Sequence, residues 1–470
     1  MSALPTSHAA QMPAAAPSKA TPAAPARFEF RPLNVGRFVV WGLFVLVLAV
    51  APLIFTSSLS ITMLSQMGIA IVACLSFNML LGQGGMLSFG HAVYTGLATF
   101  IAIHALNAIG GGLPIPVSLI PLVGGVAGMF FAVVLGYVTT KKAGTPFAMI
   151  TLGLGELVTA MALMIPEFFG GEGGISANRA VGKPVFGITY GPQIQVYYLL
   201  AVYTFICTAA MYAFTRTPLG RMLNAVRDNP ERVEFIGYST QRVRYRSFII
   251  AGFFAGVAGG MAAVNFEIAT AEVVGALRSG AYLFFTFLGG ATFFFGPIIG
   301  GILMILGFAL FSELTKAWQL YLGLIFMFMV MYAPGGIASL IMMNVRIARY
   351  KKLHQLWGWY AALTATALVM LAGLAALIEL VYRMQLNDTT GTTLRYLGFT
   401  LDTQSPASWL GALAVAAIGF ATFEFVRRRF ALQWGRIQGE IEEAMTFKEP
   451  DSPIPEGGKA AAREATLGTP

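Results

Sequence analysis

Long hydrophobic segments follow one another along almost the whole chain, separated by short polar or glycine-rich stretches. A helix needs about 20 apolar residues to cross a bilayer, and most of these segments approach that length. The pattern therefore predicts an all-α polytopic membrane protein. The predicted spans lie at about residues 38–55, 59–81, 88–107, 116–138, 146–166, 195–214, 247–266, 281–291, 297–312, 318–333, 358–382 and 408–426.

The stretch 281–312 is too long for one span and short for two, and a glycine-rich break divides it. Basic residues concentrate in cytoplasmic loops. If the N-terminus is cytoplasmic and 281–312 forms a hairpin, 24 of the 30 Lys and Arg lie inside. A single span would move the cluster from Arg346 to Lys352 outside. The charges thus favour a hairpin, whether 281–291 crosses fully or re-enters, with both termini cytoplasmic.

Residues 82–90 contain a similar glycine-rich break. The predicted architecture is therefore about ten core spans with two glycine-broken hairpins, followed by two extra C-terminal spans. Interrupted helices of this kind accompany substrate paths in transporters.

The composition supports residence in a membrane. Of 470 residues, 57% are apolar and 11% are charged, which is too little charge to cover a water-soluble domain. The net charge of +9 is explained by basic residues in the predicted cytoplasmic loops and tails. It therefore does not indicate a nucleic-acid-binding groove. Cys74 and Cys207 lie in apolar segments and are interpreted as small buried residues. No metal or other cofactor is predicted.

The most informative polar segment is the loop 215–246. Thr217 is a natural N-cap and Pro218 suits a first helical turn, so the loop predicts an amphipathic helix over about 219–236 that ends at Gly237. Such a helix is suited to docking on a partner, although an ordinary surface helix has the same composition.

Several motifs, in order along residues 38–345, carry a family resemblance. Residues 78–92 (NMLLGQGGMLSFGHA), 147–156, 220–231 (GRMLNAVRDNPE) and 288–297 resemble signatures of the branched-chain amino-acid ABC transporter permeases. The resemblance implies an inner-membrane permease subunit that pairs with a sister permease, two cytoplasmic ATPase subunits and a periplasmic solute-binding protein. Branched-chain amino acids are the first expected solutes, with urea, amides and aromatic acids also carried by similar systems.

Glu231 and Gly237 stand where these permeases keep the glutamate and glycine of their ATPase-docking motif. The other candidate site residues follow from the predicted loop helix, the glycine breaks and the polar groups within the spans. In the loop, the residues expected to couple to the ATPase are Arg221, Arg227, Asp228, Glu231, Glu234 and Gly237. In the membrane, the residues expected along the substrate path are Gly82, Gln83, Gly84, Ser88, His91, Glu156, Gly289, Gly290, Gly296 and Pro297.

Two of these membrane residues leave a choice of role. Glu156 lies in mid-span, where an ionisable group is either functional or a protonated structural group. His91, next to Gly90 at the glycine break, is more often a packing or capping residue than a ligand. One departure concerns the substrate: many members of the family carry a glutamate where this chain has Ala281, with Arg278 just upstream.

The predicted organisation is a disordered cytoplasmic tail (1–37), a transmembrane domain (38–345), an extension with two spans (346–426) and a cytoplasmic tail (427–470). The chain has no G-x-x-x-x-G-K-[ST] loop, so any ATP would be hydrolysed on another subunit. The main alternative is a secondary transporter driven by an ion gradient, which needs no docking loop. An intramembrane enzyme is not favoured, because the four histidines form no catalytic constellation.

Overall fold

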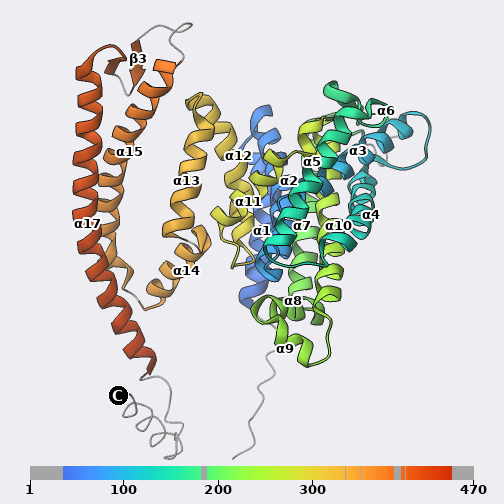
Figure 1. Ribbon diagram of the computed structural model, residues 1–470, viewed down its shortest axis with the longest axis horizontal. Coiled ribbons are helices and arrows are strands. Elements are labelled where there is room, and N and C mark those ends of the chain that lie inside the picture. The colour runs from blue at the N-terminus through green and yellow to red at the C-terminus, as the bar shows by residue number, and fades with distance from the viewer. Residues whose placement is uncertain are drawn as a thin grey trace, which may run out of the picture. The chain divides into compact units, whose positions relative to one another are not determined.

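The computed structural model describes residues 35–180, 188–333, 335–350, 352–385, 393–396 and 399–446. Helices dominate these residues, which confirms the all-α prediction (Figure 1). The chain divides into two compact units, residues 1–47 and 48–470, and α1 (Val35–Ile54) begins in the first. All other elements belong to the second unit. Most of the predicted tail 1–37 lies outside the described residues.

Nine helical segments in the described part of the chain are long and apolar enough to cross a membrane. They contain α2 (Ser58–Gly84), α3 (His91–Gly110), α4 (Ile120–Thr139), α5 (Thr145–Met164), α7 (Gln193–Arg216), α10 (Thr240–Phe266), α12 (Gly296–Leu314), α15 (Trp357–Gln385) and α17 (Pro406–Thr446).

The other predicted spans are shorter or broken. Helix α11 (Ala276–Gly289) has 14 residues. At 1.5 Å per residue it is about 21 Å long, which is less than the roughly 30 Å of a bilayer core. The span predicted at 318–333 is α13 (Trp318–Tyr332), and an unpredicted helix, α14 (Gly336–Arg349), follows it at an angle of 50°. By length and composition, α13 and α14 together count as one broken span or as a re-entrant loop.

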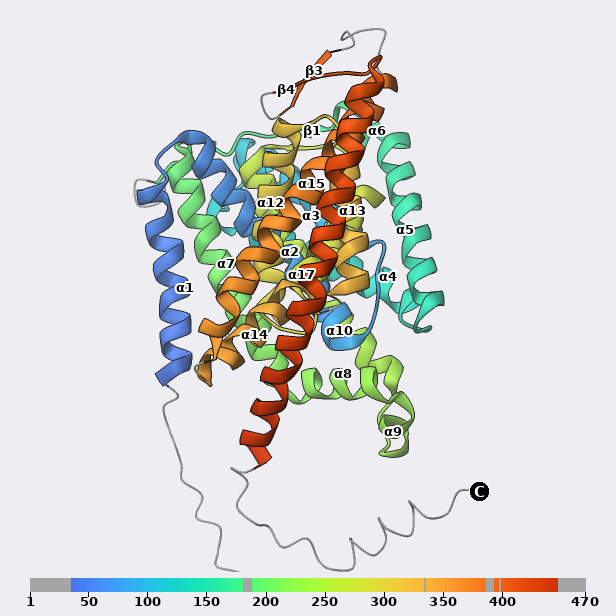
Figure 2. The same ribbon diagram turned by 90° about the vertical axis from the view of Figure 1, so that its left-hand side faces the viewer.

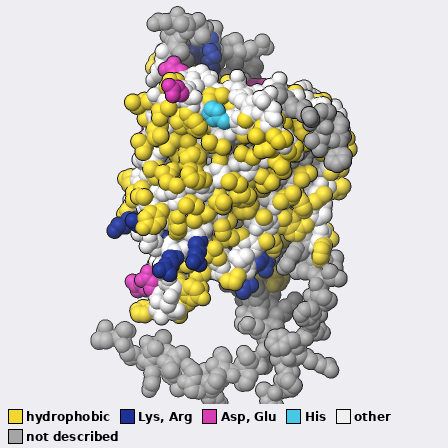
Figure 3. Space-filling view, turned by 90° about the vertical axis from the view of Figure 1, so that its right-hand side faces the viewer, with side chains coloured by type: hydrophobic (Ala, Val, Ile, Leu, Met, Phe, Trp, Pro, Cys, Tyr) yellow, Lys and Arg dark blue, Asp and Glu magenta, His cyan; other side chains and the backbone are white. Residues whose placement is uncertain are grey.

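Short elements mark the two ends of the helical bundle. Helices α8 (Pro218–Asp228) and α9 (Pro230–Phe235) lie at one end, here called the α8–α9 end (Figure 1). Helix α6 (Pro166–Phe169) and strands β1 (Ile175–Ser176) and β2 (Ile268–Ala269) lie at the opposite end, the β1–β2 end (Figure 2). Residue Ile175 pairs with Ala269 in the antiparallel sheet. Figure 3 shows one face covered mostly by hydrophobic side chains, with basic residues gathered toward the α8–α9 end.

Close backbone packing joins α4 to α10. A Cβ added to Gly124 would lie 2.5 Å from the Gly256 carbonyl oxygen, and one added to Gly128 would lie 2.4 Å from that of Gly252. Both glycine pairs have the small-xxx-small spacing that lets membrane helices approach closely. The two helices thus form a rigid pair.

The two extra spans pack on each other as a helical hairpin. A Cβ added to Gly373 of α15 would lie 2.3 Å from the backbone nitrogen of Ala416 of α17. Strands β3 (Thr393–Tyr396) and β4 (Phe399–Asp402) lie between these helices in the sequence. Because α17 continues to Thr446, the first part of the predicted tail 427–470 is helical, and residues 447–470 lie outside the described part.

Candidate functional site

The predicted coupling loop forms two short helices. Thr217 caps α8 by accepting a backbone hydrogen bond, and Pro218 occupies the first turn, as predicted. The prediction of one helix over 219–236 is wrong. Pro230 has no N–H to continue the helical ladder, so α8 ends before it and Asn229 caps the new helix α9.

Helix α8 packs on the first glycine break. Leu223 and Val226 are buried on its inner face. The Arg227 guanidinium donates a hydrogen bond to the Gly82 carbonyl oxygen. A Cβ added to Gly84 would lie 3.1 Å from the Leu223 side chain. Helix α8 is therefore in direct contact with the end of α2.

Helix α9 presents apolar side chains to solvent. Phe235 is 88% exposed, Ile236 is 66% exposed and Tyr238 is 52% exposed, and the exposed Glu231 lies in the first turn. We call Phe235, Ile236 and Tyr238 the α9 tip. Gly237, between Ile236 and Tyr238, has a φ of 88°, the left-handed conformation that favours glycine and in which helices commonly end. An apolar group rimmed by charge is typical of a protein-binding surface.

The remaining loop residues divide into exposed and paired groups. Arg221 is exposed, and Asp228 forms an ion pair with Arg227 at 2.9 Å. Glu234 accepts a hydrogen bond from the Thr240 hydroxyl at 2.8 Å, which ties α9 to the start of α10. Their part in coupling stays a prediction.

The glycine breaks meet one another in space. A Cβ added to Gly82 would lie 2.2 Å from the Ala291 carbonyl oxygen, in the second break. A Cβ added to Gly290 would lie 2.5 Å from the Gly335 carbonyl oxygen, and one added to Gly336 would lie 2.5 Å from Gly290 Cα. The ends of α2 and α11 and the bend between α13 and α14 thus form one backbone junction, here called the glycine junction. The predicted path residues Gly289, Gly290, Gly296 and Pro297 are all buried in or beside it.

The polar residues of the first break are held in the protein interior. His91 is buried, and its Nε2 lies 2.9 Å from the Ser76 hydroxyl. The Ser88 hydroxyl is also buried, without a hydrogen-bond partner among the described residues. Gln83 is half-buried. In this structure these side chains serve packing at the end of α2, and their contact with a solute stays a prediction.

Glu156 points away from the bundle. It is exposed on α5, beside the exposed side chains of Leu152 and Leu157. It therefore belongs to the outer surface of this chain rather than to its interior.

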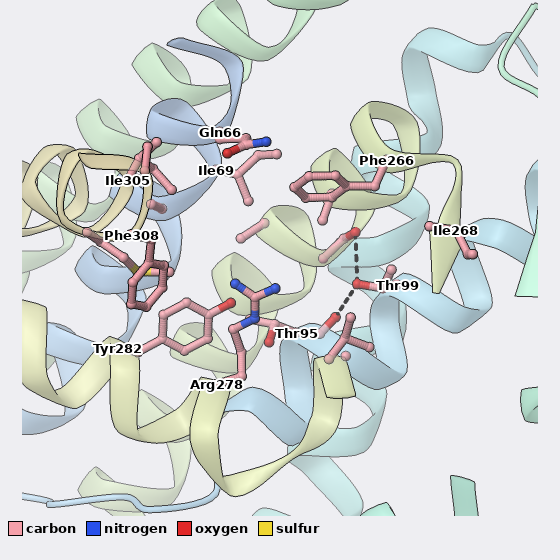
Figure 4. A pocket seen from close by; sticks show the side chains of 18 residues that line it. Gln66, Ile69, Thr95, Thr99, Phe266, Ile268, Arg278, Tyr282, Ile305 and Phe308 are labelled. Carbon is pink, nitrogen blue, oxygen red and sulfur yellow. Dashed lines mark hydrogen bonds between the residues drawn. The ribbon is translucent and has the colours of Figure 1, made fainter. Parts of the chain in front are cut away.

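A cavity of about 410 Å³ lies among α2, α3, α10, α11 and α12 (Figure 4). Most of its wall is apolar, with Ile69, Ile305 and Phe308 among the larger side chains. None of the predicted path residues lines it. The polar lining consists of Gln66, Thr95, Thr99, Arg278 and Tyr282. The cavity lies toward the β1–β2 end, because α10 and α11 contribute Phe266 from a last turn and Arg278 from a first turn.

Packing of α3 on α10 fixes one wall of this cavity. The Thr99 hydroxyl donates to the Gly259 carbonyl oxygen at 3.1 Å and to the Thr95 carbonyl oxygen at 2.8 Å. The Thr95 hydroxyl donates to the Ala92 carbonyl oxygen at 3.0 Å. Both hydroxyl protons are therefore used within the protein, and the oxygens remain available only as acceptors.

Sequence reasoning missed most of this cavity. Gln66, Thr95 and Thr99 lie in otherwise hydrophobic spans and belong to no glycine break. Of the polar lining residues, the sequence pointed only to Arg278, because it lies just upstream of Ala281, where many members of the family carry a glutamate. Ile236 and Tyr238 of the α9 tip were also missed, because exposure at the end of a short helix depends on the break at Pro230.

Comparisons with known proteins agree with this architecture. A family model described as "Branched-chain amino acid transport system / permease component" matches residues 59–334. The chain is 27% identical over 315 residues to the high-affinity branched-chain amino acid transport system permease protein LivM of Salmonella typhimurium, covering 62% of this chain and 73% of that protein. LivM of Escherichia coli is 26% identical over 318 residues, with the same shares covered. No solved structure matches the chain.

Proposed function

Since the chain belongs to the family of branched-chain amino acid transport permeases, a family of multi-pass inner-membrane proteins, we propose that it is the membrane subunit of an ATP-driven importer. In this proposal it moves branched-chain amino acids or organic solutes of similar size. ATP is hydrolysed by two cytoplasmic subunits, a sister permease completes the membrane part, and a periplasmic protein delivers the solute. The α8–α9 end faces the cytoplasm, and residues 38–345 form the permease domain.

The observation that carries this proposal is the arrangement of α8 and α9. The outer end of α9 carries the exposed α9 tip, and α8 contacts the glycine junction. The tip offers Phe235 to a soluble partner, and Arg227 of the adjoining helix holds the Gly82 carbonyl. A docked ATPase would therefore act on the breaks of α2 and α11 through two consecutive short helices, α9 and α8. A carrier driven by an ion gradient has no use for such a surface.

The test is association with the cognate ATPase subunits. We expect Glu231→Lys and Phe235→Ser to reduce co-isolation of the ATPase with the tagged chain about tenfold or more, because charge reversal or loss of an aromatic anchor at an interface costs about 2 kcal/mol or more. Membrane insertion should stay normal, since both side chains are exposed.

Gly237 gives an internally matched pair of variants. A Cβ at this position meets nothing within 4 Å, so substitution tests the backbone conformation alone. Gly237→Val should redirect the tip and lower association, whereas Gly237→Asn should retain it, because Asn tolerates a positive φ. Arg242→Gln, an exposed change on α10, serves as the control. Normal association and uptake in Glu231→Lys, Phe235→Ser and Gly237→Val would favour the gradient-driven carrier.

A further inference from the structure

The cavity among α2, α3, α10, α11 and α12 contains one charged side chain and no opposite charge. Arg278 is the only ionisable Lys, Arg, Asp, Glu or His among the residues that line it. Figure 4 shows its guanidinium turned into the cavity, near Tyr282. Within the described part of the chain, Arg278 forms no ion pair. A partly buried guanidinium without a carboxylate is costly unless an anion joins it.

The position of Arg278 in its helix increases this cost. Arg278 stands in the first turn of α11, which begins at Ala276 and carries no acidic residue there. The amino end of a helix has partial positive charge, so a cation at this place is unfavourable and an anion is favourable. The guanidinium and the helix therefore attract the same kind of ligand.

The rest of the cavity wall restricts what that anion carries. Thirteen of the 18 lining residues are apolar or glycine, including Phe266, Met304 and Phe308, so a compact hydrocarbon body is well accommodated. No Asp or Glu lines the cavity to pair with an ammonium group. The ammonium of an amino acid would meet only neutral acceptors and would lie close to the Arg278 guanidinium, which repels it.

We propose that this cavity binds small monocarboxylate anions with a compact apolar body, and that it prefers them to zwitterionic amino acids of the same skeleton. Arg278 pairs with the carboxylate, and the side chains of α10 and α12 enclose the hydrocarbon part. The inference rests on the proposed transport function in one respect only: that function makes the bound anion a transported solute. Binding itself needs no partner subunit.

The test compares three probes that share one branched skeleton: 4-methylpentanoate, leucine and 4-methylpentanamide. Binding to the purified full-length chain in phosphatidylcholine nanodiscs is measured by equilibrium dialysis. We expect 4-methylpentanoate to bind about tenfold or more tightly than leucine or the amide, since hydrogen bonds to a charged partner are the strong ones. Because ATPase subunits are absent, failure of the proposed importer function leaves this measurement unaffected.

Variants identify the residue responsible. Arg278→Gln should weaken binding of 4-methylpentanoate about tenfold or more and leave binding of the amide unchanged, which separates loss of charge from loss of folding. Arg278→Lys should keep part of the affinity. Lys316→Gln, an exposed charge change between α12 and α13, should have no effect.

Three outcomes would overturn the proposal. The first is the absence of 4-methylpentanoate binding to the wild-type chain, or its persistence in Arg278→Gln. The second is leucine binding as tightly as the acid. The third is a co-purified phospholipid that is present in the wild type and lost in Arg278→Gln, which would assign the cavity to a lipid headgroup.

Discussion

At the scale of single residues, Arg227 joins two parts of the molecule that are far apart in sequence. Its guanidinium donates to the Gly82 carbonyl oxygen, and its side chain is 39% exposed. Gly82 in turn lies against Ala291, where any side chain at position 82 would collide with a backbone oxygen. One hydrogen bond thus connects α8 to the glycine junction, where the two glycine breaks meet.

Replacement of Arg227 should weaken the coupling between ATPase binding and transport without unfolding the chain. Arg227→Gln removes a charged hydrogen bond worth about 1 kcal/mol at a half-exposed site, so we expect uptake to fall about fivefold while the ATPase still associates. Arg227→Lys should restore part of the uptake. Asp228→Asn should have little effect, because the Asp228 side chain is 66% exposed. Parallel loss of ATPase association in Arg227→Gln would instead make Arg227 part of the docking surface.

At the scale of elements, the helices differ in how much freedom their contacts leave. Helices α4 and α10 touch backbone to backbone, with the Gly128 carbonyl oxygen 3.1 Å from a Cβ added to Gly252. Helix α5 instead exposes much of its surface, including Leu157 and Glu156. We infer that α4 and α10 move together, whereas α5 offers a face to lipid or to another subunit.

A pair of alanine substitutions tests this difference. A Cβ at Gly256 would lie 2.3 Å from the Gly124 carbonyl oxygen, so Gly256→Ala must separate the helices at a cost of about 1–3 kcal/mol. The apparent melting temperature in detergent should fall by about 1–3 °C for a chain of this length. Gly153→Ala on α5 meets nothing within 4 Å and should leave it unchanged or slightly raised. Equal effects of both changes would contradict the rigid pair.

At the scale of the whole second unit, its contacts bring the basic segments to one end. Lys141 and Lys142 follow α4, whose Val133 carbonyl accepts a hydrogen bond from Tyr245 near the start of α10. Helix α14 begins at the glycine junction, and Lys352 beyond it pairs with Glu440 of α17. These segments and α8 therefore share the α8–α9 end. This clustering supports the cytoplasmic orientation proposed for that end.

Reporter fusions test the orientation directly. A fusion at about residue 175, at the β1–β2 end, should report a periplasmic position, and a fusion at about residue 460 should report a cytoplasmic one. The reason is that positively charged loops are retained on the cytoplasmic side. The full-length chain with an N-terminal reporter is the control and should agree with position 460. A periplasmic signal at 460 would show that the number of crossings is odd.

Much of this architecture follows from the sequence alone, because each span has to satisfy its own backbone in lipid. Apolar length predicted the nine described segments that are long and apolar enough to cross a membrane, the glycine-rich stretch divided α11 from α12, and Thr217 with Pro218 marked the start of α8. These features depend on neighbours in sequence. The family likewise followed from local motifs, and the match over residues 59–334 confirms it.

Only the tertiary structure decided which residues meet. The glycine junction joins Gly82 with Ala291 and Gly290 with Gly336, and no local pattern encodes such pairs. The cavity is lined by single polar residues from separate apolar helices. The exposure of Glu156 depends on which face of α5 the other helices cover. In a membrane protein both faces of a helix are apolar, so hydrophobic periodicity does not distinguish lipid from protein contact. The sequence therefore determined where the long apolar helices are, and packing determined where Arg278 lies among them.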